Sequence, residues 1–136
     1  MESQHLQCCF QDEAVAYQVI MPMIRLYLGM LPIKDIGMIE VAISEAVSNA
    51  IRACGDRNVH LQMYVHPPQG FVVRIRDHGK GFDVDHAMKK LNEWDKGIPD
   101  DSLYEESGRG LWVIHQVFDE VQYMREGSEL LLIKSL

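Results

Sequence analysis

Glu45 and Asn49 are two residues whose types and spacing could do chemistry. They lie in "SEAVSNAIRAC" (44–54), where most neighbours are small or apolar. On a helix of about 3.6 residues per turn, side chains four residues apart differ by about 40° in direction and share one face. Removing a carboxylate and an amide from water costs about 1–3 kcal/mol each unless they are hydrogen-bonded. The pair therefore marks either a solvated helix edge or a functional site.

Asp77 is a second carboxylate in an unusual place. The strand-like segment "FVVRIRD" puts Asp77 on the same face as Val73 and Ile75. A carboxylate at the end of a strand can accept a hydrogen bond from an exocyclic amine such as that of adenine. Gly79 and Gly81 follow, and without Cβ atoms they would let the backbone approach a flat base. This segment therefore suggests the recognition of a nucleotide base.

A third element is "GRG" at 108–110, at the predicted start of a helix. Gly108 and Gly110 would leave backbone N–H groups and the positive end of the helix dipole free for phosphates, and Arg109 would add a charge-assisted contact. Taken singly, each of the three elements is more often structural than functional, as short motifs usually are. Together they predict a nucleotide site, in which Asn49 supplies an oxygen to Mg²⁺ and Glu45 is a general base toward a hydroxyl.

The elements that must position these residues follow from hydrophobic periodicity and turn residues. Their order predicts an α/β (α+β) two-layer sandwich, with helices on one side of an antiparallel or mixed sheet, in one domain over 1–136. The expected elements are a strand at 5–10, a helix from about 13 with a kink at Pro22, a helix from Pro32 or Asp35 to Cys54, a hairpin at 58–66 and 71–77, a weak helix at 84–94, a mobile loop at 95–107, a helix at 111–121 and a hairpin at 121–136.

Composition narrows the class of protein. The 136 residues are 47% hydrophobic and carry a net charge of −7, which favours a packed domain and argues against nucleic acid as the main partner. No apolar run approaches the roughly 20 residues that would span a bilayer. Three cysteines without metal-ligand spacing are expected to be reduced thiols. We therefore expect a cytoplasmic protein that does not bind a membrane.

The three elements resemble the boxes of the GHKL ATPases, the superfamily of gyrase, Hsp90, MutL and histidine kinases. "EAVSN" looks like the N box, "DHGKGF" like the first glycine box and "GRGL" like the second. The short chain is most similar to the anti-sigma-factor serine protein kinases (RsbW-like), over about residues 5–136. Where relatives often continue the N box with His-Ala or His-Gly, this chain has Ala53 and Cys54, which puts one phosphate or base contact in doubt.

The resemblance implies a Bergerat ATP-binding fold, with helices on one face of a mixed sheet, and the use of Mg-ATP. It also implies phosphorylation of a STAS-type anti-anti-sigma protein, sequestration of a sigma factor and a homodimer. Carried over to this sequence, Glu45 is the base, Asn49 the magnesium ligand and Asp77 the adenine reader. The glycines and the arginine of the two glycine boxes line the pocket (Gly79, Gly81, Gly108, Arg109 and Gly110), and the loop at 95–107 is a lid over the phosphates.

Alternatives remain open at this point. The main rival is an ATP-binding interaction module that sequesters a partner with little catalysis, and another is a plain structural domain. Apolar residues of the first helix, such as Met21, Met23 and Leu28, are candidates either for partner contacts or for the core. Each of the six histidines is expected to be a surface or core residue, because no pair has metal-ligand spacing.

Overall fold

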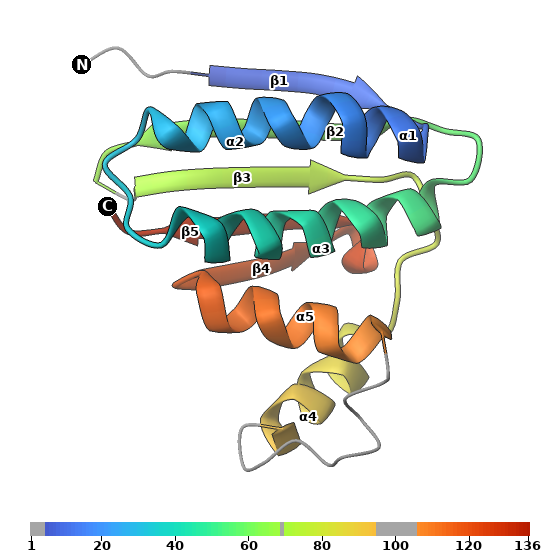
Figure 1. Cartoon of the computed structure of the whole chain (residues 1–136). Helices are drawn as coiled ribbons and strands as arrows, with labels where there is room; N and C mark the ends of the chain where they lie inside the picture. Colours follow the sequence, from blue (N-terminus) through green and yellow to red (C-terminus); the bar gives the residue numbers. More distant parts are fainter. Residues whose placement is uncertain (1–4, 69, 95–105) are drawn as a thin grey trace.

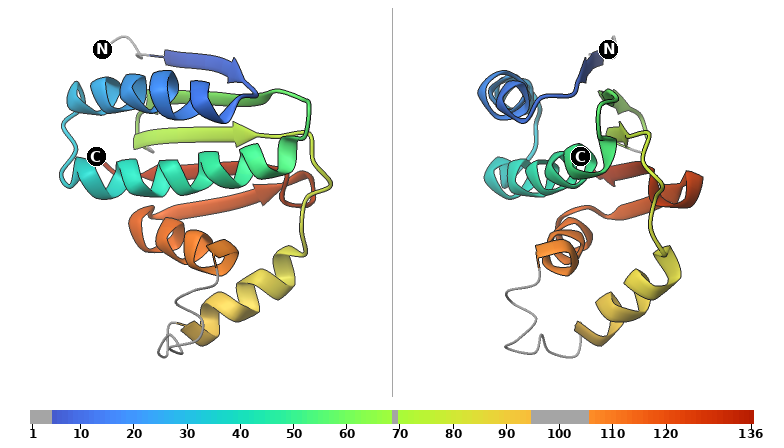
Figure 2. Two further views of the ribbon diagram at one scale, coloured as in Figure 1. Left: turned by 45° about the vertical axis from the view of Figure 1, so that its right-hand side comes forward. Right: turned by 90° about the vertical axis from the view of Figure 1, so that its right-hand side faces the viewer.

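The long helices of the protein form one layer over a five-stranded sheet, while the helix at 84–94 lies below this sandwich in Figure 1 and packs against the helix at 106–117. The structure, a computed structural model, describes residues 5–68, 70–94 and 106–136. Figure 1 looks onto the helix layer, and the side view in Figure 2 separates the long helices from the sheet. The elements are β1 (His5–Phe10), α1 (Glu13–Val15), η1 (Ala16–Ile20), α2 (Met21–Gly29), α3 (Ile36–Cys54), β2 (Val59–His66), β3 (Gly70–Arg76), α4 (Val84–Trp94), α5 (Glu106–Val117), β4 (Glu120–Met124), η3 (Arg125–Gly127) and β5 (Glu129–Lys134).

The sheet has the strand order β1-β2-β3-β5-β4, and all four pairings are antiparallel. Alternate residues of β2, from Val59 to Val65, are buried under the helices, while those between them face the other side. This alternation is what an antiparallel sheet covered on one face requires. The predicted two-layer α/β fold is therefore confirmed, and of the two sheet types that were expected the structure has the antiparallel one rather than the mixed one.

The N-terminal helical segment runs from Glu13 to Gly29 and changes form before Pro22. Asp12 caps it, since its Oδ1 accepts a hydrogen bond from the N–H of Ala14 at 2.7 Å. The five residues of η1 form a π-helical stretch that ends just before Met21. A wider turn fits there because proline has no N–H and its ring would clash with the carbonyl four residues earlier. The predicted irregularity at Pro22 is thus a π-helical segment.

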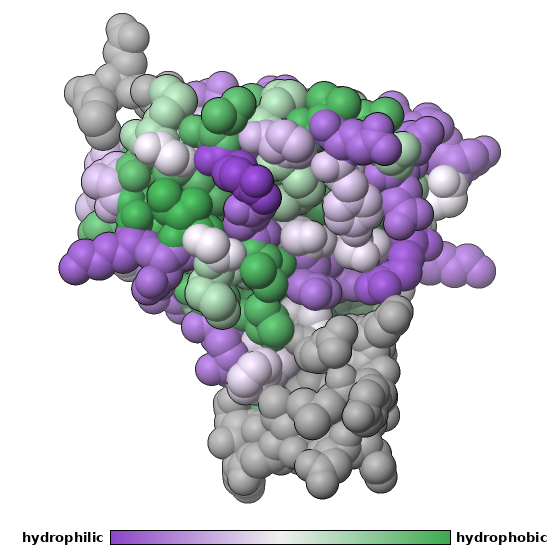
Figure 3. Space-filling model, in the orientation of Figure 1, coloured by the Kyte–Doolittle hydropathy of each residue, from purple (hydrophilic) through white to green (hydrophobic). Residues whose placement is uncertain are grey.

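The methionines and leucines of this segment are divided between the core and the surface. Met21 and Leu28 are buried in the core, while Met23 is exposed. Figure 3 shows apolar side chains at the surface over α2 and the start of α3, at the left of the view. The exposed large apolar residues of these two helices, and of the residue that follows α2, are Met23, Leu26, Met30, Met38 and Val41. Of the three candidates for partner contacts, only Met23 lies on the surface.

Helix α3 is the central element of the helix layer. Its apolar face, which includes Ile39, Ile43 and Val47, is buried against the sheet. Helix α5 packs beside it, and Ile114 of α5 and Phe118, the residue after the end of α5, are both buried. The predicted α3 is confirmed to end at Cys54, and the following Gly55 has a φ of +63°, a conformation that favours glycine.

Two further findings bear on the predictions from composition. In residues 5–68, 70–94 and 106–136, no helix combines the length and the apolar character needed to cross a membrane. The three cysteines are free thiols: Cys54 is buried, Cys8 is half-buried and Cys9 is exposed. Neighbouring Cys8 and Cys9 thus point to opposite sides of β1. Most of the loop that was predicted as a lid, residues 95–105, lies outside the described residues.

Candidate functional site

Asp77 follows directly on β3, at the end of the sheet where the turn before β5 lies. Its N–H donates to the carbonyl of Ser128 at 2.9 Å, which fixes its backbone, and its Oδ1 accepts from the N–H of Gly79 at 2.7 Å. Burial raises the pKa of Asp77, and the N–H of Gly79 and the nearby His78 counteract part of that rise. The second carboxylate oxygen has no protein donor among the described residues, so it is available to accept a hydrogen bond.

The two glycines after Asp77 are required by contacts within the protein. A Cβ on Gly79 would lie 2.6 Å from the carbonyl oxygen of Ala53, and a Cβ on Gly81 would collide with the carbonyl of Glu126. Gly81 also has a φ of +76°. The prediction explained both glycines by the approach of a base. The structure gives another reason, since it is the loop itself that packs closely against α3 and against η3.

A cavity of about 90 Å³ lies beside Asp77, between α3 and the sheet. Three alanines of α3 line one side of it, at positions 46, 50 and 53. Ile75 and Leu130, which pair in neighbouring strands, line the sheet side. The remaining lining residues are Asn49, Asp77, Gly81, Phe82, Leu111, Tyr123, Gly127 and Ser128. This cavity, called the slot below, has the carboxylate of Asp77 in its lining, and three of the four residues that α3 contributes to it are alanines.

Glu45 and Asn49 meet at the start of α5. A Cβ on Gly110 would lie 2.8 Å from Oε2 of Glu45 and 3.7 Å from Nδ2 of Asn49. The predicted sharing of one helix face is therefore confirmed, and glycine at 110 is explained by the close approach of α5 to these two side chains. Both side chains are half-buried.

The two members of the pair line different cavities. Asn49 lines the slot with Asp77, while Glu45 lines a separate groove of about 460 Å³ between α2 and α3, together with Tyr17 and Met21. The carboxylate thus lies between Gly110 and that groove. In addition, the side-chain oxygen of Asn49 accepts a hydrogen bond from Nη2 of Arg52, one turn further along α3. The oxygen that was predicted to hold Mg²⁺ is occupied by a protein donor here.

The start of α5 differs from the prediction. The helix begins at Glu106, so that Gly108, Arg109 and Gly110 lie within its first turns rather than before it. Only about the first four N–H groups of a helix lack a partner inside it. The N–H of Gly108 therefore has no partner inside the helix, whereas that of Gly110 belongs to the regular hydrogen bonding of the helix. The expectation that both glycines precede the helix is wrong in this respect.

Several residues of the slot were not among the predicted site residues. Ala46, Ala50 and Ala53 are small residues with the spacing of one helix face, a signal that the sequence contained. Ser128 is the buried polar residue of the described core; its hydroxyl donates to the carbonyl of Arg125 at 2.9 Å. In the sequence Ser128 is only part of a "GS" turn. Its place beside Asp77 results from the pairing of β3 with β5.

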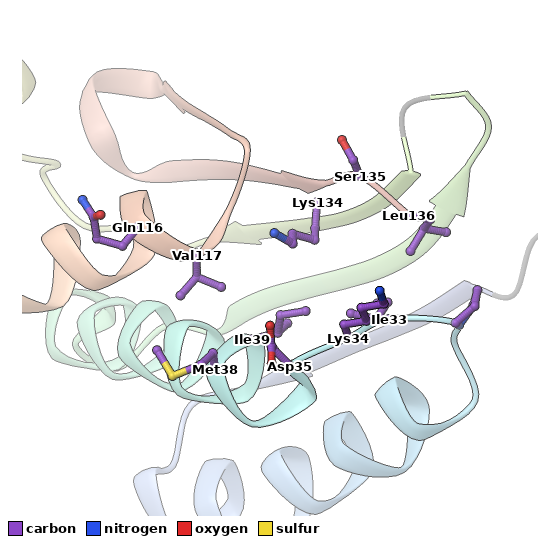
Figure 4. Close-up of a pocket in the computed structure, with 11 residues that line it drawn as sticks. Ile33, Lys34, Asp35, Met38, Ile39, Gln116, Val117, Lys134, Ser135 and Leu136 are labelled. Carbon is purple, nitrogen blue, oxygen red and sulfur yellow. The ribbon is translucent and has the colours of Figure 1, made fainter.

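A larger cavity, of about 510 Å³, lies at the other end of α3. Figure 4 shows its walls, which come from the connection between α2 and α3, the first turns of α3, the end of α5 and the residues at the end of β5. It contains Lys34, Asp35 and Lys134 on its polar side, and Ile39 and Val117 on its apolar side. None of the predicted site residues lines it, so size alone does not identify the site in this protein.

Comparison with known proteins places these features in a family. The model of the histidine kinase-like ATPase domain matches residues 14–134. The chain is similar to the serine-protein kinase RsbW of Bacillus cereus (strain ATCC 10987 / NRS 248), with 28% identity over 106 residues, which are 74% of this chain and 64% of that protein. It is also similar to the serine-protein kinase RsbW of Staphylococcus aureus (strain MSSA476), with 31% identity over 98 residues, which are 69% of this chain and 61% of that protein.

The chain thus spans less than two thirds of the length of these relatives. The family match, in contrast, extends over nearly all of the sequence and includes α3, the glycine loop after Asp77 and the start of α5. These are the elements that build the slot and the Glu45–Asn49 pair. The chain therefore belongs to the histidine kinase-like ATPase domain family.

Proposed function

We propose that this chain is an ATP-dependent serine/threonine protein kinase. The observation that carries this function is the position of Glu45: its carboxylate lies against Gly110, one turn from Asn49, and it has no hydrogen-bond or ion-pair partner among the described residues. A half-buried carboxylate without a hydrogen-bond or ion-pair partner in the described part of the chain is available to take a proton. The family match supports ATP as the nucleotide.

In this function Glu45 takes the proton of a Ser or Thr hydroxyl as the hydroxyl oxygen bonds to the γ-phosphorus of ATP. The bond from that phosphorus to the bridging oxygen breaks, and ADP leaves. Asp77 accepts a hydrogen bond from the adenine amine, while Gly79 and Gly81 shape the loop beside the base. Gly108, Arg109 and Gly110 lie toward the phosphates.

Mg²⁺, when bound, would neutralise charge on the phosphates. An amide oxygen suits this ion, because Mg²⁺ prefers oxygen ligands and takes most of them from phosphates and water. Asn49 would supply one such oxygen from the edge of the slot. The hydrogen bond from Arg52 to Asn49 must break before this oxygen can reach the ion. The residues present thus fit the group, provided that Arg52 moves.

The substrate in this function is a STAS-domain anti-anti-sigma protein, phosphorylated on Ser or Thr. A sigma factor is the second partner in a partner-switching pathway, and the kinase acts as a cytoplasmic homodimer. The relatives named serine-protein kinase RsbW support the reaction class. The STAS protein, the sigma factor and the homodimer come from the resemblance of the three boxes, and we expect neither nucleic acid nor a membrane to be bound.

A second candidate is an ATP-binding interaction module with little or no catalysis. The hydrogen bond between Arg52 and Asn49 favours it, because a module that only binds a partner has no need to free Asn49 for a metal ion. Both functions require the base slot at Asp77. They differ in whether Glu45 has a role.

Calorimetry of Mg-ATP binding tests the nucleotide site that both functions share. We expect Asp77→Asn to weaken binding about a hundredfold, because the NH₂ group of the asparagine would face the adenine amine and two hydrogen-bond donors would then meet. Asp56→Asn, at an exposed aspartate beyond the end of α3, is the matched control and should bind as the wild type does. No binding by the wild type would refute both functions. Transfer of phosphate from ATP to a STAS protein, detected by mass spectrometry, then separates the kinase from the module.

A further inference from the structure

A histidine–tyrosine pair borders the slot and has no part in the function proposed above. Nε2 of His115 lies 2.7 Å from the hydroxyl oxygen of Tyr123, and the two ring centroids are 5.8 Å apart. His115 is on α5 and Tyr123 is on β4, so the pair joins the helix layer to the sheet. Tyr123 itself lines the slot beside Asp77.

The position of Tyr123 in the sheet makes it part of the slot floor. Ile75 pairs with Leu130, and Leu130 pairs with Tyr123, so the three side chains form one row across neighbouring strands on the helix-covered face. All three line the slot. Tyr123 is the aromatic member of this row, opposite the alanines of α3. A planar ligand that enters the slot therefore meets an aromatic ring at the β4 side.

The ring of Tyr123 is held in one orientation from two sides. His115 fixes its hydroxyl end, and the ring of Phe82 meets it edge to face, with centroids 5.6 Å apart and planes at 89°. Burial raises the pKa of Tyr123 to about 12, so the hydroxyl stays neutral at physiological pH. An aromatic ring fixed in this way is suited to contact a nucleobase, because rings that need no ordering lose little entropy on binding.

We infer that Tyr123 contacts the base of the bound nucleotide and that His115 is a positioning residue, which acts by fixing the Tyr123 ring. This inference rests on the proposed nucleotide function and adds a second contact to the base beside Asp77. The competing explanation is that the pair only fastens α5 to β4. In that case, loss of the pair would lower the thermal stability of the protein, but the protein that remains folded would bind the base with unchanged affinity.

Binding of adenosine, followed by NMR titration, separates these explanations because adenosine has the base but no phosphates. Tyr123→Leu, which keeps an apolar side chain but removes the ring, should weaken the binding of adenosine and of ATP by the same factor, about tenfold, as expected for loss of an aromatic contact to a base. Tyr123→Phe should bind both within about threefold of the wild type. His115→Leu should have an intermediate effect, again equal for the two ligands.

Tyr64→Leu is the matched control, because Tyr64 is also a half-buried sheet tyrosine in contact with a histidine ring but lies on strand β2 away from the slot. It should leave both affinities unchanged. If Tyr123→Leu does not fold, intermolecular NOEs between the Tyr123 ring protons and the adenine protons of adenosine test the contact in the wild type. The inference is overturned if these NOEs are absent in the saturated complex, or if a folded Tyr123→Leu protein binds adenosine as tightly as the wild type. Failure of the wild type to bind either ligand would instead refute the nucleotide function, and the inference with it.

Discussion

The two ends of the candidate site differ in how completely they are built. At the base end, Asp77 is fixed by its backbone bond to Ser128 and by the N–H of Gly79, and it opens onto a slot between α3 and the sheet. At the phosphate end, Asn49 is hydrogen-bonded to Arg52, and Glu45 lines a separate groove. If the proposed site is correct, the base end needs no rearrangement of these contacts, while at the phosphate end a ligand has to replace the hydrogen bond between Arg52 and Asn49.

This difference has a physical origin. The base end is made by strands and by a helix that pack through a buried core, and such packing fixes backbone positions. The phosphate end depends on long polar side chains at a half-exposed helix edge, whose contacts are worth only about 1 kcal/mol net. We therefore expect the adenine end to bind by a preformed fit, and the phosphate end to rearrange when Mg-ATP arrives.

The largest expected effect separates catalysis from binding at the phosphate end. Glu45→Gln should lower the rate of phosphate transfer to a STAS protein by about a thousandfold, because the amide cannot take the proton of the hydroxyl. ATP affinity should stay within a few fold of the wild type. Glu40→Gln, in the same groove but engaged with Arg25, is the control and should keep its transfer activity. Normal transfer by Glu45→Gln would remove Glu45 from the mechanism.

A smaller effect is expected where Arg52 holds Asn49. Arg52→Ala should tighten Mg-ATP binding about threefold, because the Asn49 oxygen would no longer have to break a hydrogen bond before it binds Mg²⁺. Asn49→Ala should weaken binding about tenfold in Mg²⁺ and have little effect when EDTA is present. Calorimetry with and without Mg²⁺ measures both. Weaker binding by Arg52→Ala would instead show that Arg52 itself contacts the phosphates.

The smallest expected effect concerns stability at the base end. Burial raises the pKa of Asp77, so ionisation costs more in the folded protein than in the unfolded chain. Below the ordinary value of 3.8 the carboxyl is protonated in both states and this cost is absent; as pH rises through the folded pKa the cost is incurred in full. Asp77→Asn should therefore unfold at a slightly higher urea concentration than the wild type at pH 7. The difference in urea midpoint between Asp77→Asn and the wild type should shrink as the pH approaches 3.8. A difference that grows toward acid pH would contradict the burial of the carboxylate.

The sequence predicted the positions of the candidate residues on their helix and strand better than the contacts that these residues make. The helical spacing of Glu45 and Asn49 and the strand spacing that places Asp77 on an apolar face are local properties, and both were predicted correctly. The sequence could not show that Arg52 bonds to Asn49, because a side chain one turn away can point in several directions. The Gly110 contact with Glu45 could not be predicted either, since it depends on how closely α5 packs against α3.

By itself, the sequence determined the order of most elements, the fold class and the likeness of the three boxes to a family, because periodicity, turn residues and short motifs are written in consecutive residues. Tertiary structure alone decided which of these elements touch. The pairing of β3 with β5 puts Ser128 beside Asp77, and the pairing of β4 with β5 adds Tyr123 to the floor of the slot. Ser128 and Tyr123 are each more than 40 positions away from Asp77 in the chain. Strand pairing joins such distant segments through a shared buried face, and no local pattern encodes which segments will meet.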